Sequence, residues 1–454
     1  MKNRKFGYLL LFIILMLAAY LRIYTVIDTN VYLPLRADAG QYFSYAYNLR
    51  FHHSYSKDLA GLTKNDYEPA PDHLRNPGYP LLLMPFVDRE VTGLTLLHIT
   101  LFQAVISLIA VMLTYQLARR ALPEPAAWLV ALLTAMSPHL ININVYILSE
   151  ADAGFTTLLL FWGLAQLVAK RAKGATWVFS GILLALATLV RPSMQWFILP
   201  LAAMTWLLPD DIRQERRQSL VWMLVGFLMA MSPWWIRNLI AFGEFSDSSL
   251  MIVSLQHGMY PDCMYDGRPE TFGFPYRFDP RSAEIAQSLG TVLTEILRRF
   301  QESPMEHLRW FLLGKPVMFW DWSNDAQGAG EMFIYPVTRS PYLNSFSFMF
   351  HYSYQAMRWL HDSLVILGML GSLIVWFPLM TQKIDSGALW ILRLVSALLL
   401  YFVVLHMIVV PLPRYSIPIL PLLYLQASAT LVIVLRWGIA GFSQRFPSRN
   451  YNQP

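Results

Sequence analysis

Cysteine and charged side chains are both scarce in this chain of 454 residues. Its single cysteine, Cys263, excludes an intrachain disulfide and any zinc or iron–sulfur site that is built from cysteines. Only 14% of the residues are charged, where about a quarter is usual in soluble domains. The net charge of +6 is small and the basic residues are scattered between apolar runs, so the composition excludes nucleic acid as a partner.

Hydrophobic residues, in contrast, make up 56% of the chain and occur in long runs. A helix of about 20 apolar residues crosses the hydrocarbon core of a bilayer. Ten runs approach this length: Phe6–Ile27, Leu94–Leu117, Ala126–Ile147, Ala153–Ala169, Ala175–Val190, Met194–Leu208, Ser219–Ile236, Ser363–Met380, Ala388–Val410 and Ser416–Leu435. The sequence therefore predicts an all-α polytopic membrane protein, with about 10 transmembrane helices in a single multi-pass domain over residues 1–436.

Positive charge in the short connections predicts how the chain lies in the membrane. Lysines and arginines gather on the side of the N-terminus, as in Lys170–Lys173 and Arg213–Arg217, and an excess of this kind is typical of cytoplasmic loops. The short connections on the opposite side hold only Arg191 and Arg414. We therefore expect both termini, and a short tail at residues 437–454, to lie in the cytoplasm. A basic, short-looped chain of this kind suits a bacterial inner (plasma) membrane.

Two long segments, residues 28–93 and 241–362, then lie on the outer side, where we expect amphipathic helices at the membrane surface. Within the second segment, the apolar stretch Leu308–Trp320 is short for a span and contains Arg309 and Lys315. We interpret it as an interfacial or re-entrant segment. The part of this segment at Tyr260–Pro280 matches no pattern that we can place.

The first outer segment contains a candidate catalytic carboxylate, Asp38. The sequence Leu35–Tyr42 leads into a predicted helix, Gln41–Phe51, and Asp38 stands just before it. One interpretation is that Asp38 caps this helix, because Asp38 and Gln41 have the spacing of a capping box. The other is a carboxylate held at the outer membrane boundary and directed at a substrate. The two roles are compatible, since a cap also fixes the position of its side chain.

The order of several short motifs resembles the GT-C superfamily of glycosyltransferases, and within it bacterial members such as protein O-mannosyltransferases and the lipid A aminoarabinose transferase. No single motif is specific, but their order and their side of the membrane are. The motifs are Leu21-Arg22 in the first helix, Asp38 before Tyr42, Arg75-Asn76-Pro77-Gly78-Tyr79-Pro80, Leu148-Ser149-Glu150-Ala151-Asp152, Ser232-Pro233-Trp234-Trp235-Ile236-Arg237-Asn238, and Pro413-Arg414-Tyr415 followed by Pro418 and Pro421.

The resemblance implies a reaction at the outer face of the membrane. The donor is a sugar on a polyprenyl phosphate, and Asp38 acts as general base on the hydroxyl or amine of the acceptor. The acceptor attacks the anomeric carbon, and polyprenyl phosphate leaves with inversion. Neither the sugar nor the acceptor, which is a glycan, a lipid or a protein, is fixed by the sequence. A transporter or flippase of a lipid-linked sugar, and a non-catalytic subunit of envelope-glycan assembly, are the alternatives.

The candidate site residues follow from this reaction. We expect Asp38 and Glu150 to be catalytic, and the residues near the outer boundary to bind substrate: Arg36, Tyr42, Arg75, Tyr79, Asp152, Arg191, Arg237, His257, Arg414 and Tyr415. Arginine suits a phosphate leaving group because its planar fork binds phosphate with two hydrogen bonds. The alternatives for any one arginine are contact with lipid headgroups or an ion pair with Glu150 or Asp152.

Two further interpretations concern a metal and a helix break. Some GT-C enzymes use a divalent metal; a carboxylate beside Asp38, with His257 or His139, is a possible ligand set, but we assign no cofactor. Ser137-Pro138-His139, with Asn142 and Asn144 after it, breaks the third predicted span. This break either lines the site of the lipid-linked sugar or is a plain proline kink that neighbouring helices satisfy.

Overall fold

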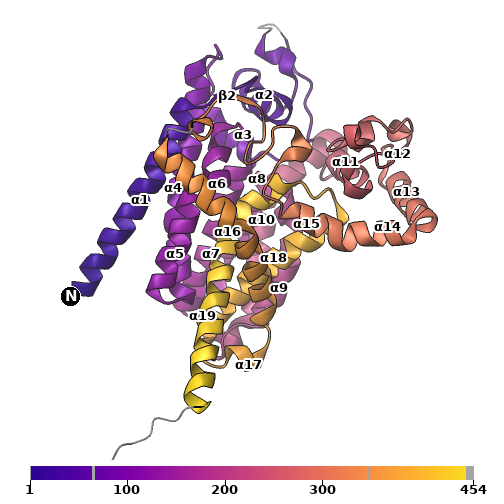
Figure 1. Ribbon diagram of the computed structural model, residues 1–454. Coiled ribbons are helices and arrows are strands. Elements are labelled where there is room, and N and C mark those ends of the chain that lie inside the picture. The colour runs from indigo at the N-terminus through magenta and orange to yellow at the C-terminus, as the bar shows by residue number, and fades with distance from the viewer. Residues whose placement is uncertain (1, 64–66, 345–346, 446–454) are drawn as a thin grey trace, which may run out of the picture.

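The structure, a computed structural model, describes residues 2–63, 67–344 and 347–445 and is built almost entirely of helices (Figure 1). The one sheet in the described residues is a two-stranded antiparallel ribbon, in which β1 (Asn30–Val31) pairs with β2 (Val337–Arg339). The ribbon joins the start of the first long connection to the end of the second. The prediction of an all-α fold is confirmed.

Six helical segments in the described residues are long and apolar enough to cross a membrane: Lys5–Asp28, Gly93–Ala121, Glu150–Ala169, Asp210–Phe242, Ser386–Ile408 and Pro413–Arg436. They correspond, in order, to most of α1 (Lys2–Asp28), to α4 (Gly93–Ala121), α7 (Glu150–Ala169), α10 (Arg216–Phe242) and α18 (Ser386–Ile408), and to the greater part of α19 (Leu420–Arg445). Two further helical segments, Glu124–Met136 and Pro138–Val145, meet at a bend of 52° and together form either a broken seventh span or a re-entrant loop. The chain is therefore a polytopic membrane protein.

The predicted number of about 10 spans stays a prediction, because the other three runs form less regular elements. Residues 174–190 form a short helical segment that ends with α8 (Val178–Val190). The run after it divides into a 3-10 turn and α9 (Ile198–Thr205), and the third forms the second half of α16 (Phe348–Ile374) and the short α17 (Pro378–Thr381). Helix α19 continues to Arg445, so the predicted tail begins as helix, and its residues 446–454 lie outside the described part.

Two glycines bring α8 and α10 into close contact. A Cβ on Gly181 would lie 1.9 Å from the carbonyl oxygen of Met223, and a Cβ on Gly226 would lie 2.1 Å from that of Val178. Both distances are far below van der Waals contact, so the two backbones approach as closely as they do only because these positions lack side chains. Small residues at helix interfaces have this role in membrane proteins, where the lipid offers no hydrophobic drive for helix association.

We expect Gly181→Val to lower the free energy of unfolding by about 1–3 kcal/mol, because the new side chain forces α8 and α10 apart. Gly93→Ala is the matched control: no atom lies within 4 Å of a Cβ built there, and we expect a change of less than about 0.5 kcal/mol. Thermal unfolding of the detergent-solubilised variants measures both. Equal unfolding temperatures for the two variants would contradict the close contact.

The two ends of the helix bundle differ. One end, at the top of Figure 1, carries α2 (Ala37–Phe51), α3 (Gly78–Leu83) and the β1–β2 ribbon, and we name it the loop face. The opposite end carries α17 and the end of α19. Helix α2 begins four residues earlier than predicted, and its N-cap is Arg36. The interpretation of Asp38 as a helix cap is therefore wrong: Asp38 lies inside the first turn, and its carboxylate bonds to side chains elsewhere.

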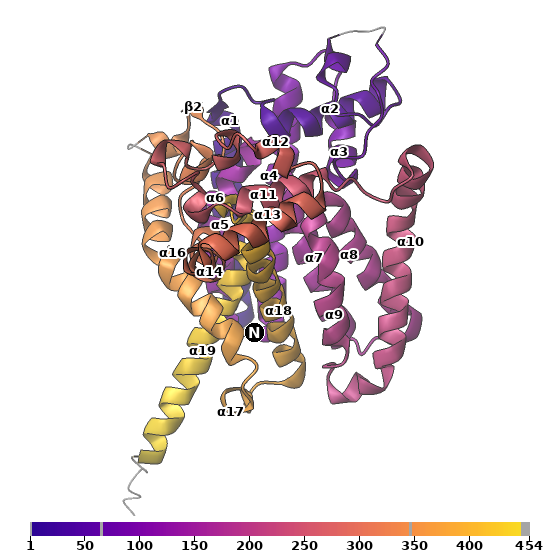
Figure 2. The same ribbon diagram turned by 90° about the vertical axis from the view of Figure 1, so that its right-hand side faces the viewer.

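The second long connection folds against one side of the bundle. Its helices α11 (Ser249–Gly258), α12 (Ser282–Ile285), α13 (Leu289–Glu302), α14 (Pro304–Arg309) and α15 (Lys315–Phe319) form what we name the lateral module, residues 249–319. The lateral module stands at the right-hand side of the bundle in Figure 1, and in Figure 2 α13 runs across the long helices and not along them. The stretch Leu308–Trp320 divides into the end of α14, a π-helical turn and α15, and it is absent from the spans found in the described residues.

Exposed apolar side chains form a stripe along the lateral module. They are Leu289, Leu293 and Leu297 on α13, Met305 and Leu308 on α14, and Leu312, Leu313 and Val317 beyond it. The three leucines of α13 are spaced four residues apart, so they share one face of that helix. Its buried face carries Val292 and Glu295. An amphipathic helix of this kind is suited to the boundary between lipid and water.

Candidate active site

Asp38 is held between two arginines at the loop face. Arg75, from the connection that precedes α3, donates from Nη2 to Oδ1 of Asp38 at 2.7 Å. Arg414, from the 3-10 turn Pro413–Ile419 that leads into α19, donates from Nη2 to Oδ2 at 2.5 Å. The side chain of Asp38 is 24% exposed, whereas those of the two arginines are mostly buried. Three distant parts of the chain thus meet at one carboxylate that solvent or a substrate can reach.

The two arginines determine the protonation state of Asp38. Burial by itself raises the pKa of a carboxyl group, but the positive charges and hydrogen bonds of Arg414 and Arg75 outweigh it. The pKa of Asp38 therefore lies well below its usual range, and the group is ionised at neutral pH. While both arginines remain bound to it, Asp38 is a weak base.

A second carboxylate, Glu150, shares one of these arginines. Glu150 is the first residue of α7 and is only 2% exposed. Arg191, which follows α8, lies with Nη1 3.1 Å from Oε1 of Glu150. The Nε atom of Arg414 lies 3.5 Å from the same oxygen, an ion pair without hydrogen-bond geometry. Arg414 therefore contacts both carboxylates. We name Asp38, Arg75, Glu150, Arg191 and Arg414 the carboxylate–arginine cluster.

Aromatic rings line this cluster. The guanidinium groups of Arg191 and Arg414 each lie 5.1 Å from the ring of Tyr415, and that of Arg75 lies 5.1 Å from the ring of Tyr42. Contacts of this kind are favourable between a cation and the face of an aromatic ring. The hydroxyl of Tyr42 also lies 3.4 Å from Oγ of Ser149. Tyr42 and Tyr415, both predicted as binding residues, are thus part of the surroundings of the cluster.

Three other predicted residues lie next to the cluster and contact other partners. The ring of Tyr79 meets that of Tyr42 edge-on, and its hydroxyl donates to Oε1 of Gln103. Arg36 lies over the ring of Tyr335, with 5.3 Å between its guanidinium carbon and the ring centre. Asp152 is completely buried within α7, and neither of its carboxylate oxygens has a hydrogen-bond partner. A substrate role for each of these residues stays a prediction.

Arg237 and His257 have their contacts elsewhere. Arg237 lies among the rings of Tyr55, Trp234 and Phe242 and donates to the backbone carbonyl of Asp72 at 2.9 Å. His257 is buried in the lateral module, with Nε2 2.7 Å from the carbonyl oxygen of Gly273. The structure therefore gives both residues a place in the packing of the long connections, and their binding role stays a prediction.

Two residues beside the cluster were absent from the sequence-based prediction. Gln41 accepts two hydrogen bonds from Arg75, at 3.1 Å from Nε and 2.8 Å from Nη2. Its position three residues after Asp38 was a usable signal, since residues with this spacing share a helix face. Tyr335, below Arg36, lies in an irregular connection whose sequence carries no comparable signal.

The structure contains the predicted helix break at Pro138, and the polar side chains there contact backbone carbonyls of this chain. His139 contacts the carbonyl of Trp322 at 2.7 Å, and Asn142 donates to the carbonyl of Met332 at 3.1 Å. Asn144 bonds to carbonyls of the preceding turn. These contacts favour the proline-kink interpretation over a sugar-lined break, because the side chains that were expected to face a cavity hold the connection between α15 and β2.

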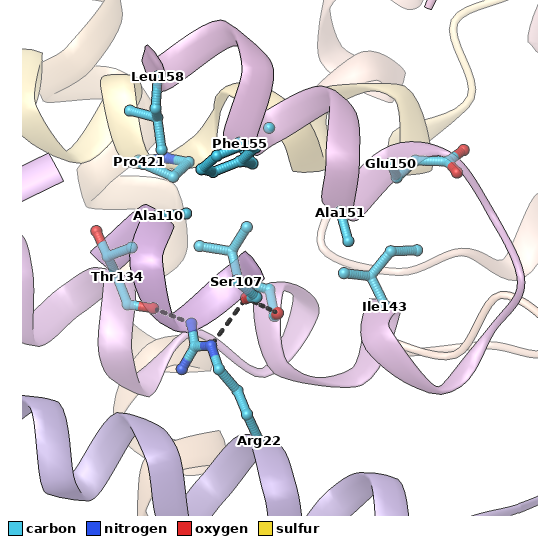
Figure 3. Close-up of a pocket in the computed structure, with 12 residues that line it drawn as sticks. Arg22, Ser107, Ala110, Thr134, Ile143, Glu150, Ala151, Phe155, Leu158 and Pro421 are labelled. Atoms are coloured by element: carbon cyan, nitrogen blue, oxygen red, sulfur yellow. Dashed lines mark hydrogen bonds between the residues drawn. The ribbon is translucent and has the colours of Figure 1, made fainter. Parts of the chain in front are cut away.

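A buried arginine supports the same break from the other side. Arg22 of α1 donates to Oγ of Ser107 at 2.8 Å and to the carbonyls of Ala135 and Thr134 at 2.9 and 3.0 Å. These carbonyls belong to the last turn of α5 (Glu124–Met136), where a helix leaves such groups unpaired. Arg22 and Glu150 both line a small cavity of about 20 Å³ (Figure 3). It has room for about one water molecule.

The carboxylates of the site do not fit a divalent metal. Both oxygens of Asp38 and Oε1 of Glu150 already face arginines, and the Nε2 atoms of His257 and His139 already contact carbonyls. In the part of the chain that the structure describes, no three histidine, cysteine, aspartate or glutamate side chains lie close enough to hold one ion. Arginine side chains occupy the positions next to these carboxylates where a metal ion would otherwise bind.

Comparisons with known proteins place this arrangement in a family context. Residues 85–236, about a third of the chain, match the family model of dolichyl-phosphate-mannose-protein mannosyltransferases. A search of curated proteins found no match.

Solved structures give a likeness over almost the whole chain. The archaeal oligosaccharyltransferase AglB from Archaeoglobus fulgidus, in complex with an inhibitory peptide and a dolichol-phosphate, has a TM-score of 0.53 at 14% identity; the match covers 99% of this chain and 53% of AglB. A second structure of this enzyme, tethered to an acceptor peptide, has a TM-score of 0.51 at 14% identity, with 97% of this chain and 51% of that one covered. ArnT from Cupriavidus metallidurans, bound to undecaprenyl phosphate, has a TM-score of 0.42 at 12% identity, with 97% and 80% covered.

At these identities the structural likeness concerns the fold, and the chain spans about half of the length of AglB. The partial match to the mannosyltransferase family model points to the same superfamily as the AglB fold. The resemblance that the motifs indicated is thereby confirmed: the chain has the fold of the GT-C integral-membrane glycosyltransferases.

Proposed function

We propose that this protein is a membrane glycosyltransferase that transfers a sugar from a polyprenyl-phosphate donor to an acceptor at the carboxylate–arginine cluster. The observation that carries the proposal is the partly exposed carboxylate of Asp38, held at the loop face between the guanidinium groups of Arg75 and Arg414. A base and a group of cations within one site are what this transfer requires. The GT-C fold and the partial family match support the assignment.

The chemistry of the leaving group explains the arginines. When the acceptor oxygen or nitrogen attacks the anomeric carbon, the bond between this carbon and the phosphate oxygen breaks, and its electron pair stays on the polyprenyl phosphate. Negative charge therefore accumulates on the phosphate in the transition state, where fixed cations stabilise it. Arg414 and Arg191, which lie side by side against Tyr415, are suited to bind it with two hydrogen bonds each.

Asp38 takes the proton that the acceptor loses, and the same arginines control its basicity. Arg414 bridges Asp38 and Glu150, so a donor phosphate competes with Asp38 for the guanidinium. When the phosphate takes Arg414, Asp38 loses one of its two counter-charges and its pKa rises toward the ordinary value. Asp38 thus becomes a stronger base when the donor is bound, and attack from the face opposite the phosphate inverts the anomeric centre.

The proposal includes an orientation. The loop face carries the cluster, and the charge of the short connections supports placing this face outside the cytoplasm, with both termini inside. In a bacterium the enzyme would lie in the inner membrane, with its site on the periplasmic side. The lateral module, which packs beside Arg414, would then lie in the outer leaflet and cover the acceptor side.

A turnover assay tests the proposal. Purified protein receives a panel of polyprenyl-phosphate sugars with candidate glycan, lipid and peptide acceptors, and mass spectrometry measures released polyprenyl phosphate and modified acceptor. Donor-dependent release together with acceptor modification is the expected result. Asp211→Asn is the matched control, because Asp211 pairs with Arg171 at the opposite end of the bundle and should be dispensable. Lipid movement across vesicles without release would favour a flippase.

We expect a chelator such as EDTA to leave turnover within about twofold of its starting value. Both oxygens of Asp38 and Oε1 of Glu150 already face Arg75, Arg414 and Arg191, which supply the positive charge at the site. Released polyprenyl phosphate, measured before and after dialysis against EDTA and again after addition of Mg²⁺ or Mn²⁺, checks this. A loss of activity that either metal restores would contradict it.

A further inference from the structure

A buried lysine in the lateral module contacts the end of a membrane-spanning helix. Lys315, the first residue of α15, is completely buried. Its Nζ donates to the carbonyl oxygens of Met407 and Ile408 at 3.0 and 3.1 Å and lies 3.6 Å from the centre of the Phe311 ring. These carbonyls belong to the last turn of α18, where they lack partners within the helix and where a cation is favoured by the helix dipole.

The lysine has no ion-pair partner among the described residues, so carbonyl oxygens and an aromatic ring alone hold its ammonium group. Burial accordingly lowers the pKa of Lys315 to about 7. Burying an amine without a carboxylate is costly, and a residue with only a packing role would be better filled by methionine or leucine. This cost indicates that the contact with the end of α18 has a purpose beyond filling space.

The chain that leaves this helix end leads directly to the catalytic cluster. After α18 ends at Ile408, residues 409–412 connect it to the turn that carries Arg414. The lateral module holds this connection closely. The amide of Val410 donates to the carbonyl of Ser254 at 3.1 Å. A Cβ on Gly258 would lie 2.7 Å from the backbone of residues 409 and 410.

A small hydrophobic cluster completes the contact. Val410 and Leu412 pack with Trp310, Cys263 and Ala326, all of them buried. The indole Nε1 of Trp310 also donates to the carbonyl of Gly258 at 2.9 Å. The connection therefore has fixed contacts along its length, and at its start its position is set by the two hydrogen bonds of Lys315.

We infer that Lys315 is a positioning residue for the transfer reaction: by fixing the end of α18 it sets the place from which Arg414 reaches both Asp38 and Glu150. The inference rests on the proposed function. Arg414 lies six residues beyond Ile408, so a shift of the helix end is passed to its guanidinium through a short and tightly packed segment. Misplacement of a catalytic group by about 1 Å costs up to about 100-fold in rate.

Lys315→Met tests this inference, since methionine fills a similar volume and lacks the hydrogen bonds. We expect kcat to fall about 10- to 100-fold, with a smaller change in KM for the donor. Lys315→Arg, which keeps the charge and the donors, should recover most of the loss. Trp310→Phe is the matched control: it removes the bond to Gly258 within the same cluster, leaves the carbonyls of α18 untouched, and should keep kcat within about twofold.

The single cysteine reports whether the variants remain packed. Cys263 lies in the same cluster and is fully buried, so we expect a maleimide to label it slowly in the wild type. A lower kcat in Lys315→Met while Cys263 stays protected supports positioning. A wild-type kcat in Lys315→Met, or an equal loss in Trp310→Phe accompanied by rapid labelling of Cys263, would overturn it. If the wild type itself neither binds undecaprenyl phosphate nor releases it from any donor, the proposed function fails and this inference fails with it.

Discussion

Asp38→Asn is expected to lower turnover by about 1,000-fold or more, because the asparagine amide cannot accept the proton that the acceptor loses. The variant should still fold. Arg75 keeps its two hydrogen bonds to Gln41, and Arg414 keeps its ion pair with Glu150 and its contact with Tyr415, so no buried guanidinium loses all of its partners. Release of polyprenyl phosphate and thermal unfolding, measured on the same preparation, separate the two effects.

Asp38→Glu serves as the control for charge, since it keeps a carboxylate and moves it by about one methylene length. We expect it to retain part of the activity that Asp38→Asn loses. An Asp38→Asn variant that turns over as fast as the wild type would show that Asp38 is not the base, and Glu150, the other carboxylate of the cluster, would be the next candidate.

Arg414→Gln is expected to lower kcat/KM by about 100- to 1,000-fold, which is the range for removal of one donor that stabilises transition-state charge. Arg414 is the one arginine of the cluster that contacts both carboxylates. Glutamine can donate to one of them, but it is uncharged and cannot bind a phosphate through two charge-assisted hydrogen bonds as arginine does. Arg414→Lys keeps the charge without the fork, and we expect it to restore only part of the loss.

The same variant changes the pH dependence in a defined direction. In the wild type the pKa of Asp38 is held well below its usual range by Arg414 and Arg75. Removal of Arg414 raises this pKa, and the base must be deprotonated to act, so the acid limb of the profile of kcat/KM moves to higher pH. An acid limb that stays in place would show that Asp38 is not the group that titrates there.

The sequence predicted the members of the cluster better than their pairing. Asp38, Arg75, Glu150 and Arg414 were selected because their motifs resemble those of a known family, and Arg191 because it is a basic residue in a connection on the side that is otherwise poor in positive charge. Which arginine meets which carboxylate depends on how the helices pack in three dimensions. No local pattern shows that Arg414 reaches two carboxylates while Arg237, in an equally suggestive motif, lies among the aromatic rings of Tyr55, Trp234 and Phe242.

Local rules also failed where a distant contact overrides them. Asp38 and Gln41 have the spacing of a capping box, yet α2 begins before Asp38, because the carboxylate bonds to two arginines and Gln41 to one of them. Hydropathy correctly located the longest apolar helices along the sequence. It could not separate full spans from the shorter helical segments α8 and α9, since a helix buried among other helices is apolar at any length.

The pairing in the cluster has a consequence for the order in which the protein is made. Each carboxylate has an arginine partner that follows it within a few dozen residues, Arg75 for Asp38 and Arg191 for Glu150, so the partner of each is made soon after it. Arg414, which joins the two pairs, comes 376 residues after Asp38. At about 5–20 residues per second its synthesis follows roughly 20–75 s later. On the proposed function, the site is therefore complete only after Arg414 and the start of α19 have been made.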